Sequence, residues 1–545
     1  MAPHTLRPMA ARRKGQQYRP DTMAAVGLAT MAALLLAPPV FGDTPPRDGL
    51  SAYLAARAAD AQGQGGAALA DYRAALDAAP ANPAVAIRAY REALAGGDLA
   101  LARRAAAVLT RAGVAPMDAA LFPLADAARA DDLAAATTAT AALATDRLAL
   151  LVPSLRGWLA RGRGEDGAAA IVAGTDPAGR RLATETRVLL LLADGRLDDG
   201  LAAVRALGTG ATATRVAAAE LLIGADKSAE ARRLLGSDAF SLAAARAGAT
   251  ARPDLAWGVS RLLLRVADDL DGEDTSATAV ALARAALVAD PGFQRARLLL
   301  ADQLGRGDDP ARASAELDAV PSQGPLGAIV AARRVELLAR QDRVPAALAL
   351  ARTLADAPDA RPLDRARYAD LLFGDGRPAD ALPWYARVLK SDGARDNWAA
   401  WLRYGGALDE AGRWRDAEKA LRRALALAPD EPSVLNYLGY TLVDRGEDVA
   451  AGTAMLERAH RLAPDDSAIA DSLGWAYFRR GDLGRALSLV EGAAVELPAD
   501  AEVNDHLGDL YWALGRRFEA RYAWRAALLT AEPRDRVAIN AKLAR

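Results

Sequence analysis

Three histidines are the residues of this chain best suited to acid–base or metal chemistry, because the sequence contains no cysteine. His4 lies in a basic N-terminal stretch, and His460 and His506 lie in helical segments without a histidine or cysteine four residues away. A metal site or a catalytic base needs such a partner close by. We therefore interpret His460 and His506 as surface or packing residues.

Three short motifs resemble ligand-binding loops but lack the required context. Residues 208–213 have the glycine spacing of a dinucleotide loop, yet they follow a helical segment instead of a strand. Residues 224–228 have aspartate where a phosphate loop needs glycine, and the acidic run 268–274 lacks the distal glutamate of a calcium loop. The sequence thus predicts no catalytic residue, no cofactor and no metal site, and we expect the chain not to be an enzyme.

The composition favours many short helices packed closely together. Hydrophobic residues make up 52% of the chain and aromatic residues only 5%, so the apolar fraction is mainly small and aliphatic. Alanine is the best helix former and allows helix backbones to approach each other. At 545 residues the chain exceeds one compact core, and its formal charge of −1 lacks the excess of positive charge typical of nucleic-acid binding. We expect an all-α protein that does not bind nucleic acid.

The C-terminal third repeats its sequence with a period of 34 or 35 residues. When the repeats are aligned, the first column contains glycine, the second a large apolar residue, the third glycine again, and the fourth a small residue near the start of the next helix. The columns are Gly405, Gly439, Gly474 and Gly508; Leu408, Leu442, Tyr477 and Tyr511; Gly412, Gly446, Gly481 and Gly515; and Ala417, Gly452, Ala486 and Ala520.

These columns resemble the tetratricopeptide repeat (TPR), in which each unit is a hairpin of two amphipathic helices. We expect the glycine after the first helix to adopt a positive φ, and the small residues of the first and fourth columns to lie where the paired helices cross. The resemblance is clearest over residues 398–534, and it is also good over 49–116 and 362–397. It implies a right-handed superhelix, an α-solenoid in which each hairpin contacts only its neighbours.

The repeat rhythm indicates about 14 hairpins between residues 49 and 534, followed by a capping helix. We expect N-terminal TPR-like repeats over residues 43–270, middle helical repeats over 271–397 and a C-terminal TPR domain with its capping helix over 398–545.

The TPR resemblance also implies which side chains line a concave, partner-binding groove. Matching the repeat offsets residue by residue selects Asn436, Tyr440, Asp471, Trp475, Phe478, Arg479, Asp505, Asp509 and Trp512. Aromatic rings beside acids suit a protein or peptide segment with apolar and basic side chains. The alternative is that these rings pack between adjacent repeats as core. The groove lacks the lysine and asparagine pattern with which some TPR domains hold a terminal carboxylate.

The stretches LNYLGYTLVDRG, DSLGWAYFRRGDL and HLGDLYWALGRRFEA resemble a narrower group, the periplasmic TPR adaptors that bind carboxy-terminal processing proteases. This resemblance implies a scaffold or adaptor that presents cell-envelope proteins to such a protease. A TPR component of a polysaccharide or outer-membrane export machinery is the alternative. The known adaptors are lipoproteins, whereas a chain without cysteine cannot carry that lipid anchor.

The N-terminal 42 residues have the pattern of an export signal. Five basic residues precede the apolar run 23–37, and Val40 and Gly42 provide small residues before a cleavage site. We expect cleavage near Gly42 and a periplasmic or otherwise exported protein. An uncleaved anchor is the alternative, although the run is shorter than the ~20 apolar residues that span a membrane.

Overall fold

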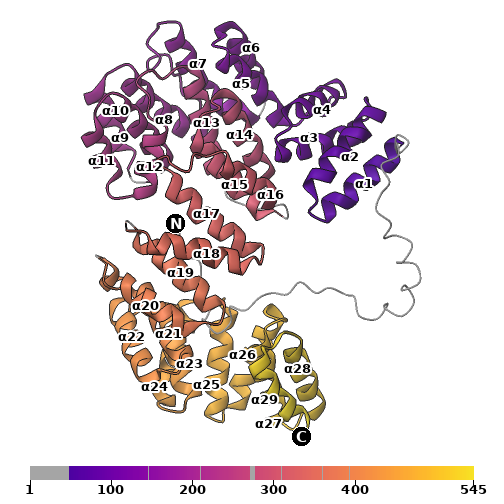
Figure 1. Cartoon of the computed structure of the whole chain (residues 1–545), viewed down its shortest axis with the longest axis vertical. Helices are drawn as coiled ribbons and strands as arrows, with labels where there is room; N and C mark the ends of the chain where they lie inside the picture. Colours follow the sequence, from indigo (N-terminus) through magenta and orange to yellow (C-terminus); the bar gives the residue numbers. More distant parts are fainter. Residues whose placement is uncertain are drawn as a thin grey trace. The chain divides into compact units, whose positions relative to one another are not determined.

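The computed structural model describes residues 48–144, 147–208, 210–270, 276–307, 310–358, 360–391 and 393–545. The expected export signal, residues 1–42, lies outside them. Every regular element in these described ranges is a helix, which confirms the all-α solenoid prediction (Figure 1). No helix among them is long and apolar enough to cross a membrane.

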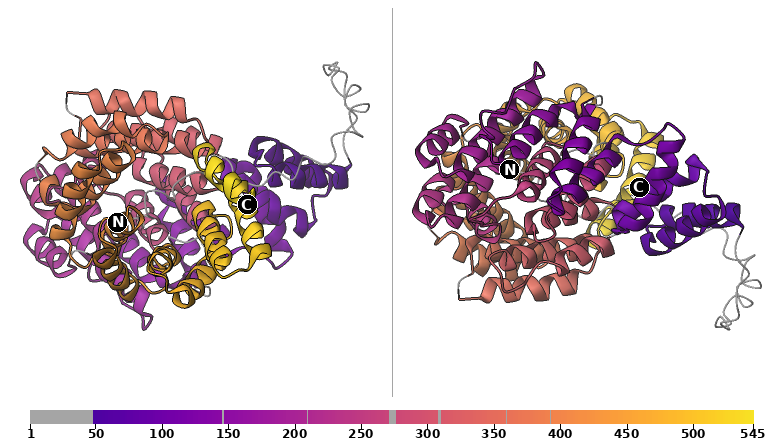
Figure 2. Two further views of the ribbon diagram at one scale, coloured as in Figure 1. Left: turned by 90° about the horizontal axis from the view of Figure 1, so that it is seen from below. Right: turned by 90° about the horizontal axis from the view of Figure 1, so that it is seen from above.

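Contacts divide the chain into two compact units, Val40–Arg343 and a second unit whose described part starts at Val344. In Figure 2 the colours run in sequence order from helix to helix within each unit. The domain boundaries that we expect near residues 271 and 398 lie where the sequence repeats become easier or harder to recognise. The division by contacts is a different property and does not test these boundaries, so they stay predictions.

The N-terminal unit contains helices α1–α17. Their bounds are α1 Gly49–Ala61, α2 Gly65–Ala78, α3 Pro83–Gly96, α4 Leu99–Arg111, α5 Leu121–Arg129, α6 Leu133–Leu143, α7 Val152–Gly162, α8 Pro177–Ala193, α9 Leu197–Ala206, α10 Thr212–Gly224, α11 Ser228–Leu235, α12 Ala239–Ala247, α13 Leu255–Asp268, α14 Ser276–Ala289, α15 Gln294–Arg306, α16 Pro310–Asp318 and α17 Gly327–Arg340. Short 3-10 helices cover Met117–Ala120 and Arg147–Leu151.

The C-terminal unit contains helices α18–α29. Their bounds are α18 Val344–Asp356, α19 Pro362–Gly374, α20 Pro378–Val388, α21 Trp398–Glu410, α22 Trp414–Leu427, α23 Pro432–Asp444, α24 Val449–Leu462, α25 Ser467–Arg479, α26 Leu483–Glu496, α27 Ala501–Ala513, α28 Arg517–Thr530 and α29 Pro533–Leu543, with a 3-10 turn at Ala394–Asp396. Each odd-numbered helix from α19 to α27 packs on the helix that follows it, and α29 packs on α28 as the expected cap.

The glycine columns explain the geometry of these C-terminal hairpins. A Cβ added to Gly474 would lie 2.5 Å from Val490 Cγ2, and one added to Gly508 would lie 2.3 Å from Trp524 Cδ1. The first and second helices therefore touch at positions where only glycine fits. The glycines that end the first helices have positive φ, between 66° and 81° in the four repeats, as expected.

Aspartates begin the first helices of the last two repeats. The side chain of Asp466 accepts hydrogen bonds from the backbone N–H groups of Ala468 and Ile469, and Asp500 does the same for Glu502 and Val503. These caps satisfy donors that the first turn of a helix leaves without a partner. They therefore fix where α25 and α27 begin.

The N-terminal unit departs from the expectation that each hairpin contacts only its neighbours. Helix α14 packs on α3 and α5, and α13 packs on α5 and α7. The buried Arg284 of α14 donates hydrogen bonds to the backbone carbonyls of Leu94 (2.8 Å) and Ala95 (2.9 Å) at the C-terminal end of α3, and forms a 2.6 Å ion pair with Glu316. Helix ends expose unpaired carbonyls that attract a cation, which explains why an arginine so distant in sequence is held there.

Candidate partner-binding site

The first helices α23, α25 and α27 carry the nine residues that the TPR resemblance selects. Helix α25 packs directly on both α23 and α27, so equivalent positions of successive repeats lie on adjacent helices. The residues separate into a group around Trp475, mainly from α23 and α25, and a group around Trp512 at the end of α27.

Trp475 lies at the centre of the first group and is half-buried. Its indole stacks on the imidazole of His506 from the next repeat, with ring centroids 4.1 Å apart and an interplanar angle of 13°. On the same helix it stacks on Phe478 at 5.0 Å, and its Nε1 donates a 3.3 Å hydrogen bond to Asp444. Trp475 thus joins three consecutive repeats and also keeps part of its ring accessible.

A polar network lies beneath these rings. Nδ1 of His506 is 2.9 Å from Oδ2 of Asp471, and the hydroxyl of Tyr440 donates a hydrogen bond to Glu502. We call Tyr440, Asp471, Trp475, Glu502 and His506 the Trp475 cluster. Its members come from three consecutive repeats, so it fixes the position of α25 between α23 and α27.

His506 is only 5% exposed and is held in its protonated form at neutral pH. Burial alone would lower its pKa, but the carboxylates of Asp471, Glu502 and Asp505 outweigh that effect and raise the pKa to about 9. Burial has the opposite effect on the Glu502 carboxyl and raises its pKa. His506 and the hydrogen bond from the Tyr440 hydroxyl partly counteract this rise. The structure therefore places His506 in the core as a charged packing residue.

Two of the selected polar residues are buried and leave little surface for a ligand. Asn436 is 1% exposed and Asp471 is 5% exposed, and the Oδ1 atom of each has no hydrogen-bond partner in the described structure. Arg479 is exposed, and its Nη1 donates a 2.9 Å hydrogen bond to the backbone carbonyl of Asp444. Asn436 and Asp471 thus contribute to packing between repeats, while Arg479 lies on the surface.

Trp512 belongs to the second group, at the end of the repeat stack. Its ring lies 5.3 Å from that of Trp524, and the guanidinium of Arg517 lies 3.5 Å above it. Asp505 and Asp509 both bind the ammonium of Lys542 from the capping helix at 2.7 Å. These residues therefore anchor α28 and α29.

Sequence reasoning did not select Asp444, Glu502 or Lys542, which complete the two groups. The sequence contains one indication of the polar network: His506 follows Asp471 by 35 residues, which is one repeat length. A residue that follows another by one repeat length lies at the equivalent position of the adjacent first helix, so these two side chains could be expected to lie close together.

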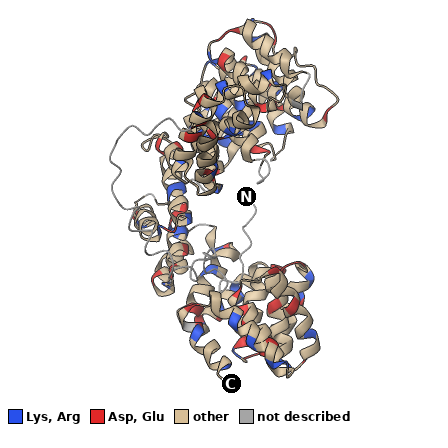
Figure 3. Cartoon of the chain, turned by 90° about the vertical axis from the view of Figure 1, so that its right-hand side faces the viewer, with Lys and Arg blue, Asp and Glu red and all other residues tan. Residues whose placement is uncertain are grey.

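Figure 3 shows positive and negative residues interspersed along the helices, in line with the small net charge.

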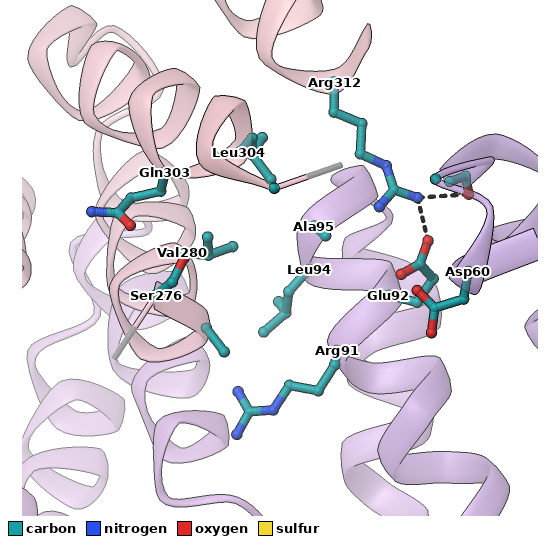
Figure 4. Close-up of a pocket in the computed structure, with 14 residues that line it drawn as sticks. Asp60, Arg91, Glu92, Leu94, Ala95, Ser276, Val280, Gln303, Leu304 and Arg312 are labelled. Carbon is teal, nitrogen blue, oxygen red and sulfur yellow. Dashed lines mark hydrogen bonds and ion pairs between the residues drawn. The ribbon is translucent and has the colours of Figure 1, made fainter. Parts of the chain in front are cut away.

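The N-terminal unit contains a pocket of about 430 Å³ between α3 and α14–α16 (Figure 4). Leu94, Val280 and Leu304 give it an apolar lining. At one side Arg312 donates hydrogen bonds to Glu92 and, at 2.6 Å, to the backbone carbonyl of Gly65. This pocket exists because α14–α16 lie against α1–α3.

The motifs that resembled ligand loops lie between helices. Residues 208–213 cover the turn before α10 and its first two residues, with Thr209 outside the described residues, and residues 224–228 run from the last residue of α10 to the first of α11. Most of the acidic run 268–274 is also outside them, although Asp268 pairs with Arg295. Among the residues that are described, no group of three or more histidines and carboxylates could hold a metal ion.

Comparison with known proteins identifies the repeat family of one segment of the chain. Residues 372–438 match the family model described as "Tetratricopeptide repeat". No curated protein is significantly similar in sequence.

Several solved structures align with this chain over part or most of its length. The APC/C hetero-tetramer Cut9-Hcn1 is 16% identical, with 91% of this chain and 95% of that chain covered and a TM-score of 0.40. A tetratricopeptide repeat protein from Parabacteroides merdae ATCC 43184 is 15% identical, with coverage of 46% and 97% and a TM-score of 0.39. MamA is 23% identical, with coverage of 30% and 93% and a TM-score of 0.25.

The family match extends from the end of α19 into α23, and the same glycine contacts and turns continue through α28. Residues 372–438 therefore contain a tetratricopeptide repeat, within a chain whose described helices form an all-α repeat fold.

Proposed function

We propose that this protein is an exported adaptor that holds a protein partner on the first-helix face of its C-terminal repeats. The observation that carries the proposal is the pair of half-buried, stacked rings of Trp475 and Phe478 beside Asp444, whose side chain is 52% exposed. Aromatic anchors with a charged neighbour are the usual centres of protein interfaces.

The chemistry of this face defines the partner segment. An apolar side chain of the partner would cover the free edge of Trp475, and a basic side chain would pair with Asp444. Asp444 now lies 3.7 Å from Arg479, an exposed pair that a partner can exchange at little cost. We therefore expect a segment with an apolar and a basic residue close together.

The sequence supplies the pathway part of the proposal. Residues 1–42 have an export pattern, and the repeats over 398–534 resemble periplasmic adaptors of carboxy-terminal processing proteases. In this role the protein binds the protease and a cell-envelope substrate together. Simultaneous binding raises the effective concentration of one for the other without any chemistry by the scaffold.

The test compares Trp475→Ala with Trp384→Ala in the full chain, using a purified carboxy-terminal processing protease from the same cells. Trp384 is a half-buried tryptophan on α20, a second helix, so both variants lose a comparable ring. Both should lower the melting temperature. Only Trp475→Ala should also weaken protease binding, by ~2–4 kcal/mol for a buried anchor.

Equal protease affinity of the two variants would show that the first-helix face is not the binding site. If the protease fails to bind the unmodified chain and components of a polysaccharide or outer-membrane export machinery bind in its place, the adaptor role is wrong and the alternative is right.

A further inference from the structure

Exposed large apolar side chains are concentrated at the C-terminal end of the repeat stack. Six of the twelve most exposed ones in the described part of the chain lie between α26 and α29, and the two aromatic ones are both on α28. The six are Val495, Leu514, Phe518, Tyr522, Leu529 and Val537. Solvent-exposed aromatic residues at two positions of one helix face need an explanation, since exposed apolar residues normally occur singly.

Helix α28 carries a continuous strip of these side chains. Phe518, Tyr522 and Leu529 are 80%, 71% and 76% exposed. At 3.6 residues per turn they and Arg525 fall within an arc of about 60° and extend over about 16 Å of helix. The opposite face of α28 is buried and includes Trp524. The strip therefore protrudes from a rigidly packed helix.

The charge around this strip is positive. Eight lysines and arginines but only three acids lie between Arg516 and Arg545, and three further acids, Asp505, Asp509 and Glu491, pair with Lys542 and Arg516 of this segment. Arg521 and Arg525 form no ion pair with any described residue, and Arg521 lies 6.0 Å from the Trp512 ring. Glu519, the acid on α28, is paired with Arg516. The guanidinium groups beside the strip are thus available for an external anion.

We propose that this face of α28, the strip of Phe518, Tyr522 and Leu529 with Arg521 and Arg525, binds an anionic lipid surface. Protruding aromatic and leucine side chains insert into the boundary between headgroups and acyl chains, and adjacent arginines bind the phosphates at that level. Each such arginine contributes about fivefold to binding. This surface belongs to a second helix, separate from the Trp475 cluster, and does not depend on the proposed adaptor role.

The two signals complement each other physically. A few inserted side chains alone bind a bilayer weakly, and a few arginines alone bind it only at low salt. Together they give reversible attachment to an anionic membrane by a chain that has no cysteine for a lipid anchor. A protein partner of acidic character is the competing occupant, and the test separates the two.

The absence of cysteine from the chain makes a local test possible. Tyr522→Cys in the full chain is labelled with an environment-sensitive fluorophore, and Thr110→Cys, an exposed position on α4, is the matched control. The two proteins are mixed with vesicles of phosphatidylcholine, with or without phosphatidylglycerol. Because each label reports only its own surroundings, binding through another segment does not affect the result.

We expect the label at Tyr522 to shift to the blue on vesicles that contain phosphatidylglycerol, and the label at Thr110 to stay unchanged. Adding Arg521→Glu and Arg525→Glu should weaken the apparent affinity by at least about tenfold, with helicity and melting temperature unchanged because both side chains are exposed.

Three results would overturn the proposal. These are no shift on anionic vesicles, an equal shift on phosphatidylcholine alone, and a shift that appears without vesicles as the protein concentration rises. The last result would identify a second copy of the chain as the occupant. Capture of an acidic envelope protein by α28, without a vesicle response, would identify a protein partner.

Discussion

Protonation of His506 should make the stability of the C-terminal repeats depend on pH between about 7 and 9. The residue is buried, and Asp471 with its acidic neighbours raises its pKa to about 9. In the unfolded chain a histidine has a pKa of about 6.5. The folded repeats thus bind this proton more tightly than the unfolded ones do.

The sign and size of the effect follow from that difference. Below about pH 6.5 His506 is protonated in both states, and its full contribution is present, up to about 3 kcal/mol. The contribution is lost as the pH rises through about 9, because the folded protein then no longer holds the extra proton. The free energy of unfolding should fall over this interval.

The composition of the chain makes the interval easy to interpret. There are three histidines and no cysteine, so few other side chains titrate between about pH 7 and 9. His506→Gln should remove the pH dependence and, near pH 7, cost about 3 kcal/mol or more, since it leaves Asp471 buried without its cation. His460→Gln, on the half-buried surface of α24, is the matched control and should retain the dependence.

Urea unfolding with short protease pulses measures the effect locally, because peptides from α25 to α27 can be followed separately from the N-terminal unit. The reasoning is refuted if the unfolding free energy of this region is the same at about pH 7 and about pH 9, or if His506→Gln retains the dependence of the unmodified chain.

Arg284→Met should destabilise the N-terminal unit by ~1–3 kcal/mol, because the carbonyls of Leu94 and Ala95 would lose their buried donor while Glu316 keeps its ion pair with Arg297, and hydrogen exchange at the end of α3 should accelerate first. Gly508→Ala should cost ~1–3 kcal/mol, since the new methyl group would overlap Trp524; Gly492→Ala on α26, where a Cβ meets nothing within 4 Å, should instead stabilise by ~0.5–1 kcal/mol. Thermal melting checks this glycine pair, and equal effects of the two alanines would contradict the packing explanation.

The C-terminal fold could be predicted because its determinants are local and repeat. A glycine column such as Gly474 and a turn glycine such as Gly481 recur every 34 or 35 residues, and the structure gives each the predicted place. The contacts of Arg284 with α3 could not be predicted in this way. They join residues 190 positions apart, in a region where the repeat interval drifts and no column marks a partner.

The candidate site was predictable only in part. The offsets placed Tyr440 and Trp475 on adjacent first helices, which the structure also does. They could not show that Trp475 stacks on His506, because an offset gives the direction of a side chain and not its partner. Whether the face binds a partner stays a prediction.

The long-range contacts of the N-terminal unit affect the order in which the protein folds. In the C-terminal repeats, stabilising pairs such as Asp471 with His506 are one repeat apart, so each hairpin can fold on the preceding one with low contact order. In the N-terminal unit, Glu92 meets Arg312 only after 220 further residues, and the closure of so long a loop is slow. We therefore expect the first hairpins to emerge early during synthesis and to stay incompletely packed until α16 has been made, and the last repeats to fold soon after they appear.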